Sequence, residues 1–307
     1  MNSDLHFITQ EDARRTYLIY EKDQSAHIAR ITMNRPEKLN AWPPEGAREL
    51  VPVLDDVEQD DTIKVVILRG AGKAFCTGVD LGMVGSQYGW DPAKHPGEKP
   101  PRPSVRRRLV ADKVSSRLFA RLFYCQKVTI ASVQGYCLGG GFDWFMSCDL
   151  SVVTEDARFG HPGRRIVGPA NGLNMILWFT KLGPTLCHEL MYTGRQLTAP
   201  EALQHHVVNK MVSMDKLEQE TNTLAKTVAL MPADGIVMAK SNMQLYRDIM
   251  GMNAGYSFGY IAHTLGTNIR YEPDELNFLK ERRDKGARQA FHERDERFAR
   301  AAEDGQT

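Results

Sequence analysis

The sequence predicts an α/β fold followed by a helical C-terminal region. Up to about residue 214, short apolar runs typical of buried strands alternate with segments of helical periodicity. Two of these apolar runs are each followed by a glycine-containing loop that opens a helix. From residue 215 onward the pattern is almost entirely helical. We therefore expect an α/β core over residues 1–214 and a helical region over residues 215–307.

The N-terminal elements follow from local patterns. Residues 17–20 and 27–33 predict two strands around a polar turn, and residues 45–59 place apolar side chains at helical spacing. Val65–Leu68 is apolar throughout, as in a strand that is buried on both faces of a parallel sheet. Residues 70–82 then form a loop punctuated by glycines that leads to a helix.

An inserted loop, at about residues 88–108, interrupts the predicted core. Its part from Trp90 to Arg108 contains five prolines and many charges, so we expect neither a regular helix nor a central strand there. Long loops in compact domains are either flexible surface segments or functional lids. The sequence leaves both interpretations open for this insert.

The later elements alternate until the helical region begins. In chain order we expect a helix at 112–123, a strand at 128–133, a glycine turn with a helix to 148, a strand at 150–153, and helices at 173–182 and 187–193. Within the helical region, Met231-Pro232 and Glu272-Pro273 are the expected breaks.

Charge and apolar content limit the classes of partner. The chain has 39 basic and 38 acidic residues, a net charge of +1, which argues against general nucleic-acid binding. RNA binding by the arginines of the insert is a weak alternative. No segment approaches the roughly 18 consecutive apolar residues of a membrane span, so we expect no membrane partner.

The five cysteines show neither a C-x-x-C pair nor the cysteine–histidine spacing of a zinc site. An odd number of cysteines in a chain of this length favours reduced thiols. We therefore expect a cytoplasmic protein without a metal ion.

The stretch from Gly135 to Asp143 carries the strongest chemical signal. It contains three consecutive glycines, Gly139 to Gly141, where a helix is expected to begin. The first N–H groups of a helix have no partner within it, so they favour negative charge in front of them. Asp143 follows within one turn. Exposed amides beside a carboxylate indicate chemistry on a carbonyl that becomes an oxyanion.

This stretch and the loop Lys73–Leu81 together resemble the two loops of the crotonase, or enoyl-CoA hydratase/isomerase, superfamily. Further segments resemble motifs of that family in the same order, namely Asn34-Arg35-Pro36 with Leu39-Asn40-Ala41, Phe159-Gly160-His161-Pro162, Leu197–Leu203 and Val207–Val212. The resemblance covers roughly residues 15 to 290, and the order and spacing of the motifs make it specific.

The resemblance implies a spiral of β-β-α units, a helical region that forms trimers or dimers of trimers, and coenzyme A thioester substrates. It implies an oxyanion hole made by the backbone N–H groups of Val79 and Gly140. No cofactor is implied, because coenzyme A enters as part of the substrate. The residues expected to line the path of the substrate are Lys38, Asn40, Ala41, Ala74, Asp80, Leu81, Gly139 and Gly141. Arg106 to Arg108, Lys280 and Lys285 are alternatives for the phosphates, or simply solvated charges.

The chain departs from the family pattern at both catalytic carboxylates. Hydratases of the family use two glutamates; here Asp143 stands at the first position and Gly163 at the second. We expect Asp143 to act as the general acid/base, with its pKa raised if Trp144 keeps it dry. His161 is the first candidate for a second group because imidazole titrates near neutrality. Other candidates are Asn171, Glu155 and Arg164, the last as a partner for a substrate carboxylate.

The expected function is therefore that of an acyl-CoA-processing enzyme of the enoyl-CoA hydratase/isomerase type, acting on a bulky or unusual acyl group. The alternatives on the same scaffold are hydrolysis of the thioester and hydrolysis or lysis of a carbon–carbon bond. A non-catalytic binding member of the family is the alternative from another class.

Overall fold

The strands of the chain form two sheets. The structure is a computed structural model, which describes residues 5–12, 15–83, 88–90, 94–98, 101, 103–168, 174–266 and 269–304. Its strands are β1 (Ile8–Thr9), β2 (Leu18–Asp23), β3 (Ile28–Met33), β4 (Val65–Gly70), β5 (Val128–Val133), β6 (Tyr136–Leu138), β7 (Leu150–Thr154), β8 (Arg158–Gly160), β9 (Leu197–Thr198) and β10 (Lys210–Val212).

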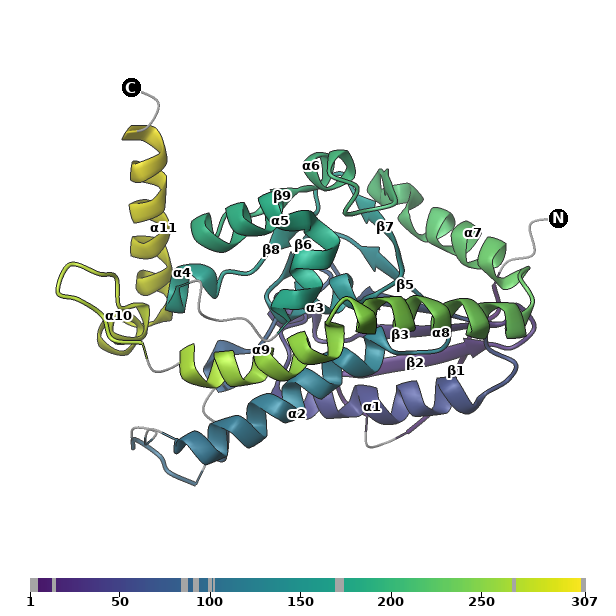
Figure 1. Cartoon of the computed structure of the whole chain (residues 1–307), viewed down its shortest axis with the longest axis horizontal. Helices are drawn as coiled ribbons and strands as arrows, with labels where there is room; N and C mark the ends of the chain where they lie inside the picture. The colour runs from purple at the N-terminus through teal and green to yellow at the C-terminus, as the bar shows by residue number, and fades with distance from the viewer. Residues whose placement is uncertain are drawn as a thin grey trace.

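Helices cover both faces of the larger sheet (Figure 1). The α-helices are α1 (Pro44–Gln59), α2 (Val105–Phe123), α3 (Gly140–Ser147), α4 (Arg164–Val167), α5 (Met175–Thr193), α6 (Ala199–Gln204), α7 (Leu217–Ala229), α8 (Ala233–Ile249), α9 (Met252–Gly266), α10 (Phe278–Lys285) and α11 (Ala287–Asp304). Short 3₁₀ helices are η1 (Pro36–Lys38), η2 (Leu81–Met83) and η4 (Met214–Lys216).

The larger sheet has the strand order β1-β2-β3-β4-β5-β7-β10, and its strands from β3 onward are parallel. The apolar strand β4 lies at its centre. Val66 and Leu68 pack into the main core with α1, whereas Val65 and Ile67 pack into a smaller core with α7. Burial on both faces explains why this strand has no alternating pattern, and it confirms the predicted parallel strand.

The smaller sheet has the order β6-β8-β9 and shows the repeating unit of the fold. The chain passes from β5 to β6 to α3, and then from β7 to β8 to α4 and α5, so each turn gives one strand to each sheet. The direct glycine turn expected between β5 and α3 is therefore wrong. The three residues of β6 are too few for a periodic pattern, and they become a strand by pairing with β8 and with Cys76.

Two helices differ from the sequence-based expectation. The helix expected to begin at residue 112 begins at Val105, directly after the last proline of the insert, with the Ser104 hydroxyl accepting a hydrogen bond from the Arg107 N–H. The helices expected at 173–182 and 187–193 are the two halves of α5, which meet at a kink where Gly183 has φ +70° and ψ +165°. Pro184 follows and lacks the N–H that would continue the ladder.

The C-terminal region is helical, as predicted, and it breaks at the two predicted prolines. Its helices also complete the α/β core. α7 covers the face of the larger sheet opposite α1, and α9 packs on α2 and α5. α11 projects from one end of the molecule (Figure 1). None of the described helices combines the length and apolar character needed to cross a lipid bilayer.

Candidate active site

The two glycine loops lie side by side because backbone hydrogen bonds pair them. The Phe75 N–H donates a hydrogen bond to the Gln134 carbonyl, and the Leu138 N–H donates one to the Cys76 carbonyl; both are 2.8 Å long. The buried Asn40 side chain fixes the first loop from the other side. Its amide Nδ2 donates to the carbonyls of Ala71 and Ala74, 2.9 and 2.8 Å away.

The loops approach so closely that only glycine fits at their contact. Gly78 has φ +91°, and a methyl group on its Cα would come within 2.8 Å of the Gly140 amide nitrogen. A methyl group on Gly141 would collide with the Cys76 carbonyl oxygen. The glycines of both motifs are thus required by backbone contact.

The amides of Val79 and Gly140 have no hydrogen-bond acceptor among the residues that the structure describes. The Trp42 N–H donates a 2.7 Å hydrogen bond to the Gly78 carbonyl, and the Asp80 N–H donates a 2.8 Å hydrogen bond to the Trp42 carbonyl. The N–H of the intervening Val79 therefore points away from Trp42. The Gly140 N–H is the first of α3 and therefore has no intrahelical acceptor. Among the described residues, neither group donates a hydrogen bond.

Asp143 lies in the first turn of α3, and its side chain is buried, with 5% of its surface exposed. The indole Nε1 of Trp178 donates a 2.8 Å hydrogen bond to its Oδ1. Burial raises the pKa of Asp143, whereas the Trp178 hydrogen bond and the nearby Arg164 guanidinium favour the charged form and limit the rise.

The tryptophan that contacts Asp143 is Trp178 on α5. Trp144, expected in this role, is buried elsewhere. Its ring stacks on Trp42 with the ring centres 4.9 Å apart. Successive residues of a helix point in directions about 100° apart, so the neighbour in sequence faces another side. Trp178 could not be assigned from the sequence, because α3 and α5 meet only through the fold.

His161 lies next to the same indole, with ring centres 6.0 Å apart. Its Nδ1 accepts a 3.1 Å hydrogen bond from the Gly163 N–H, so this nitrogen carries no proton. Burial and the positive charge of Arg164 lower the pKa of His161 to about 3. The imidazole is therefore neutral near pH 7 and is unable to serve there as a charged acid.

Three further polar side chains surround Asp143. The Arg164 guanidinium lies over the Trp178 ring, its Cζ 4.9 Å from the ring centre, and burial lowers its pKa to about 10, so it stays charged near pH 7. Asn174 is also buried and lowers the pKa of Asp143 as a hydrogen-bond partner, and the charge of Asp143 raises the pKa of the buried Tyr256. Asn171 lies outside the described residues, and Glu155 is exposed.

The residues expected on the substrate path divide into exposed and structural ones. Lys38 is exposed on η1, whereas both polar atoms of the Asn40 side chain form hydrogen bonds within the protein. Asp80 forms a 2.8 Å ion pair with Arg35, and that same arginine donates to the Ala41 carbonyl. The remaining members contribute backbone: Ala74 and Leu81 accept hydrogen bonds, and Gly139 donates one to Gly160.

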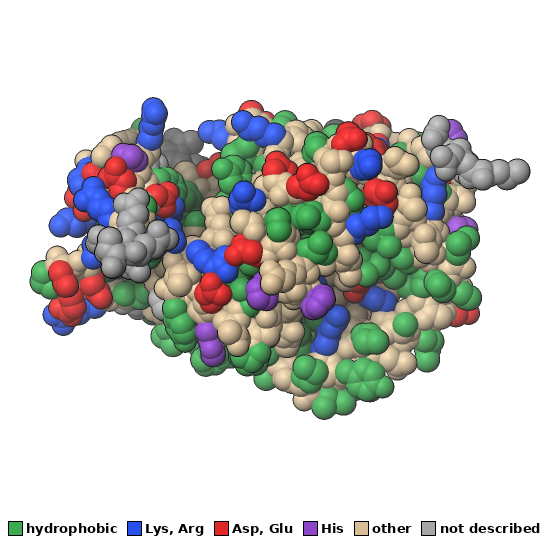
Figure 2. Space-filling model, turned by 90° about the horizontal axis from the view of Figure 1, so that it is seen from above, with side chains coloured by type: hydrophobic (Ala, Val, Ile, Leu, Met, Phe, Trp, Pro, Cys, Tyr) green, Lys and Arg blue, Asp and Glu red, His purple; other side chains and the backbone are tan. Residues whose placement is uncertain are grey.

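The charges proposed as alternatives for phosphate binding are also placed. Arg106, Arg107 and Lys280 are exposed, and Lys285 is paired with Glu281 and Glu293. Positive and negative side chains are interspersed on the face shown in Figure 2. Across the described ranges, no cluster of three or more His, Cys, Asp or Glu side chains is arranged to hold a metal ion.

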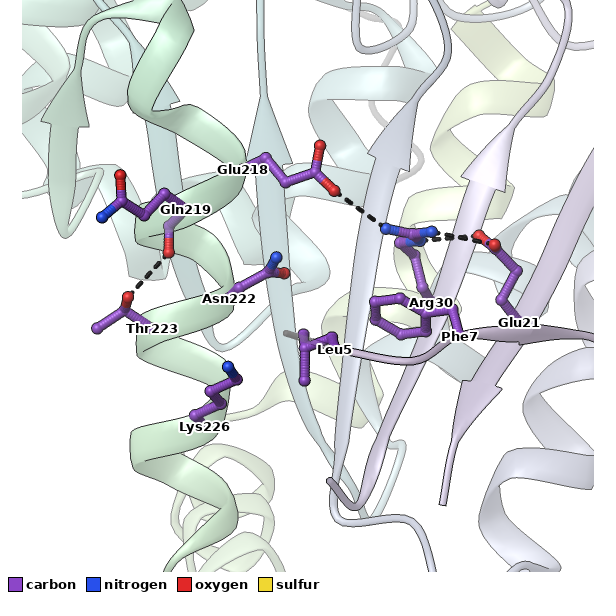
Figure 3. A pocket seen from close by; sticks show the side chains of 9 residues that line it. All are labelled: Leu5, Phe7, Glu21, Arg30, Glu218, Gln219, Asn222, Thr223 and Lys226. Carbon is purple, nitrogen blue, oxygen red and sulfur yellow. Dashed lines mark hydrogen bonds and ion pairs between the residues drawn. The ribbon is translucent and has the colours of Figure 1, made fainter. Parts of the chain in front are cut away.

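A surface cavity of about 550 Å³ lies away from these loops, between α7, β2, β3 and the N-terminal segment (Figure 3). Its central charge is Arg30, which pairs with Glu21 and with Glu218 and lies over the ring of Phe7. The central charge of the cavity is therefore already neutralised by two carboxylates.

Comparisons with known proteins identify the family of the chain. The family model of enoyl-CoA hydratase/isomerase matches residues 23–253. A relative from Thermus thermophilus is 30% identical over 90% of this chain and 98% of its own length. The short-chain-enoyl-CoA hydratase of Clostridium acetobutylicum is 30% identical over 69% of this chain and 74% of its own. The crystal structure of an enoyl-CoA hydratase from Mycobacterium smegmatis superposes with a TM-score of 0.77 at 27% identity, covering 92% of this chain and 94% of that one. The chain belongs to the enoyl-CoA hydratase/isomerase family.

Proposed function

We propose that this enzyme shifts the double bond of an enoyl-CoA thioester, with Asp143 as its single acid/base. The observation that carries the proposal is a dry carboxylate, in the first turn of α3, directly after the unpartnered Gly140 N–H. A carboxylate in such surroundings accepts a proton more readily than one in water. The free amide is suited to a neighbouring oxyanion.

In the proposed step, the ionised Asp143 removes a proton from the carbon next to the thioester carbonyl of a 3-enoyl chain. The electron pair moves into the carbonyl, whose oxygen becomes negative and accepts hydrogen bonds from the N–H groups of Val79 and Gly140. Each such donor contributes about 3 kcal/mol. The protonated Asp143 then returns the proton to the far carbon of the former double bond. The product is the 2-enoyl isomer, and no atom is gained or lost.

Isomerisation needs one base, and the site supplies one carboxylate. The second carboxylate position holds Gly163, and the main influences on the pKa of Asp143 from the described residues include no other carboxylate. His161 is neutral and has its Nδ1 engaged. Two-carboxylate hydration therefore has less support. Hydration remains the second candidate, because the Clostridium acetobutylicum relative is named a short-chain-enoyl-CoA hydratase.

We propose coenzyme A as part of the substrate, with no separate cofactor, and a bulky or unusual acyl group. Support for the acyl group comes from Gly163 at the second carboxylate position and from the charge of Arg164, which acts on Asp143. A cytoplasmic location is supported by the five cysteines, which are all buried and unpaired.

We also propose that the chain forms a homotrimer or a dimer of trimers through its helical region. Large apolar side chains on α8 and α9 are exposed, including Met238, Ile249, Phe258 and Leu265, each more than 60% exposed. A monomer rarely leaves so many of them in water.

The function is tested by incubating the purified protein with 3-hexenoyl-CoA and, separately, with crotonyl-CoA. The proposal predicts a conjugated 2-enoyl product of unchanged mass from the first substrate. Addition of water to crotonyl-CoA without isomerisation of 3-hexenoyl-CoA would instead establish hydration. Release of free coenzyme A would establish a hydrolase.

A further inference from the structure

Arg164 carries a buried positive charge that Asp143 attracts through space, without a direct ion pair. Its residue surface is 6% exposed, and it forms no ion pair with a carboxylate of the described residues. Its Nη2 donates a 3.3 Å hydrogen bond to the Met175 sulfur. Its Nε and Nη1 are buried and have no acceptor among the described residues. The adjoining residues 169–173 contain no acidic side chain that might pair with it.

Other buried donors lie in the same place. Within the described ranges, the Tyr256 hydroxyl is buried without a hydrogen bond. The Asn174 amide is also buried, and its approach to Asp143 favours the charged carboxylate. Arg164, Asn174 and Tyr256 come from three different helices or their ends. Arg164 and Tyr256 interact electrostatically with Asp143, and Asn174 acts on it as a hydrogen-bond partner. Buried donors of native proteins are almost always satisfied, so several at one point indicate a bound polar group.

A buried charge without a direct ion pair destabilises the fold, and this cost is tolerated mainly where function requires it. A guanidinium is chemically suited to a carboxylate, to which it donates charge-assisted hydrogen bonds. The proposed site holds the thioester group beside Asp143. The buried donors of Arg164, Asn174 and Tyr256 would therefore meet the far end of the acyl chain.

We propose that Arg164 binds a carboxylate at the far end of the acyl chain, so that the substrates are coenzyme A thioesters of dicarboxylic acids. This inference rests on the proposed function, in that the ligand is an acyl-CoA held next to Asp143. Asn174 and Tyr256 supply additional donors to the same group.

The carboxylate lies a few bonds from the reacting carbon. Asp143 and Arg164 both contact the Trp178 indole, the first by the hydrogen bond to Nε1 and the second across the ring face. One indole therefore spans the distance between the base and the anion-binding group. Short dicarboxylic chains match this distance.

The test measures binding of saturated thioesters, which are not turned over. Isothermal titration calorimetry compares succinyl-, glutaryl- and adipyl-CoA with hexanoyl-CoA, on the wild-type protein, on Arg164→Met and on Arg165→Met. Arg165 is the matched control, because its guanidinium lies over Phe298 and donates to the Thr193 carbonyl. Thermal unfolding of each variant verifies that it is folded.

The wild-type protein and Arg165→Met are expected to bind the best dicarboxylic thioester roughly 10- to 100-fold more tightly than hexanoyl-CoA. Folded Arg164→Met is expected to lose this preference while keeping its affinity for hexanoyl-CoA. Equal wild-type affinities for all four thioesters would overturn the carboxylate site and leave the proposed function standing, with only water at the guanidinium. Retention of the preference by Arg164→Met would also overturn it. A wild-type protein that binds none of the thioesters would overturn the proposed function as well.

Discussion

Asp143 is held between two opposing influences. Burial in the first turn of α3 raises the pKa of its carboxyl, and the Trp178 N–H and the Arg164 guanidinium act in the other direction. The ionised form remains available, but it is poorly solvated and therefore basic. The acid limb of the pH profile of kcat/KM should accordingly lie above the range of an ordinary aspartate.

Replacing Trp178 by Phe should move this acid limb to higher pH. The substitution removes the hydrogen bond that favours the charged carboxylate, so the pKa of Asp143 rises and the ionised base is lost at a higher pH. At pH values on the limb, kcat/KM should fall several-fold. Trp144→Phe is the control, because Trp144 is equally buried and stacks on Trp42. A limb that moves equally in both variants would refute the role of the Trp178 hydrogen bond.

Replacing Asp143 by Asn should abolish most activity and stabilise the fold. The loss in kcat should be about 10²- to 10⁴-fold, the usual contribution of a general acid/base. Because the pKa of Asp143 is raised in the folded state, its stabilising contribution is fully present below the unfolded pKa and is lost as the pH rises through the folded pKa. At pH 7 the charged side chain is a cost, so the variant should have the higher Tm. The difference in Tm should shrink in acid; a lower Tm for the variant at pH 7 would contradict the raised pKa.

Single residues show what the sequence can predict about the site. The carboxylate and the free helix amide follow from local pattern, since both lie in one glycine-rich stretch. Trp178 and Tyr256 do not, because they come from helices 35 or more residues away and their position depends on packing. Asn40 was expected on the substrate path, but a buried amide must satisfy its hydrogen bonds, and here it does so with loop carbonyls.

At the scale of elements, the two glycine loops act as one unit. Gly78→Ala should reduce kcat/KM by at least an order of magnitude, because the new methyl group presses on the Gly140 amide. Gly97→Ala is the matched control, since Gly97 has a similar positive φ of +78° but open space around it. Steady-state kinetics of both folded variants checks the contact. Equal losses of activity would show that the contact with Gly140 has no special importance.

Element prediction succeeded where a pattern was long enough to be periodic. The apolar strands β4 and β5, the helix α1 and the proline breaks were correctly predicted. The strands β6 and β8 have three residues each, and pairing partners determine them. The start of α2 was missed because the proline-rich insert and the helix share a highly charged composition, which carries no apolar stripe.

At the scale of the whole molecule, the helical region packs onto the α/β core. α7 closes one face of the larger sheet, and α9 carries Tyr256 toward Asp143. The composition change near residue 215 therefore marks the end of the strands. The sequence patterns predict where the strands end, but the position of α9 next to the first 214 residues follows only from the packing.

Size-exclusion chromatography with light scattering should give the mass of a trimer or hexamer. Replacing the exposed Ile249 and Phe258 together by Glu should shift the mass to that of a monomer, because charges are costly in an apolar interface. Ile8→Glu is the control, since Ile8 is 70% exposed on the N-terminal edge strand. A monomeric wild-type protein would contradict the proposed assembly.

The central claim is that Asp143 and two main-chain amides generate a thioester enolate. Mass spectrometry of hexanoyl-CoA incubated with the enzyme in deuterated water tests it most directly, because exchange at the carbon next to the carbonyl requires that intermediate and no net reaction. The wild-type protein should introduce deuterium at this carbon, and Asp143→Asn should not. Absence of exchange with the wild-type protein, or equal exchange with both proteins, would contradict the account.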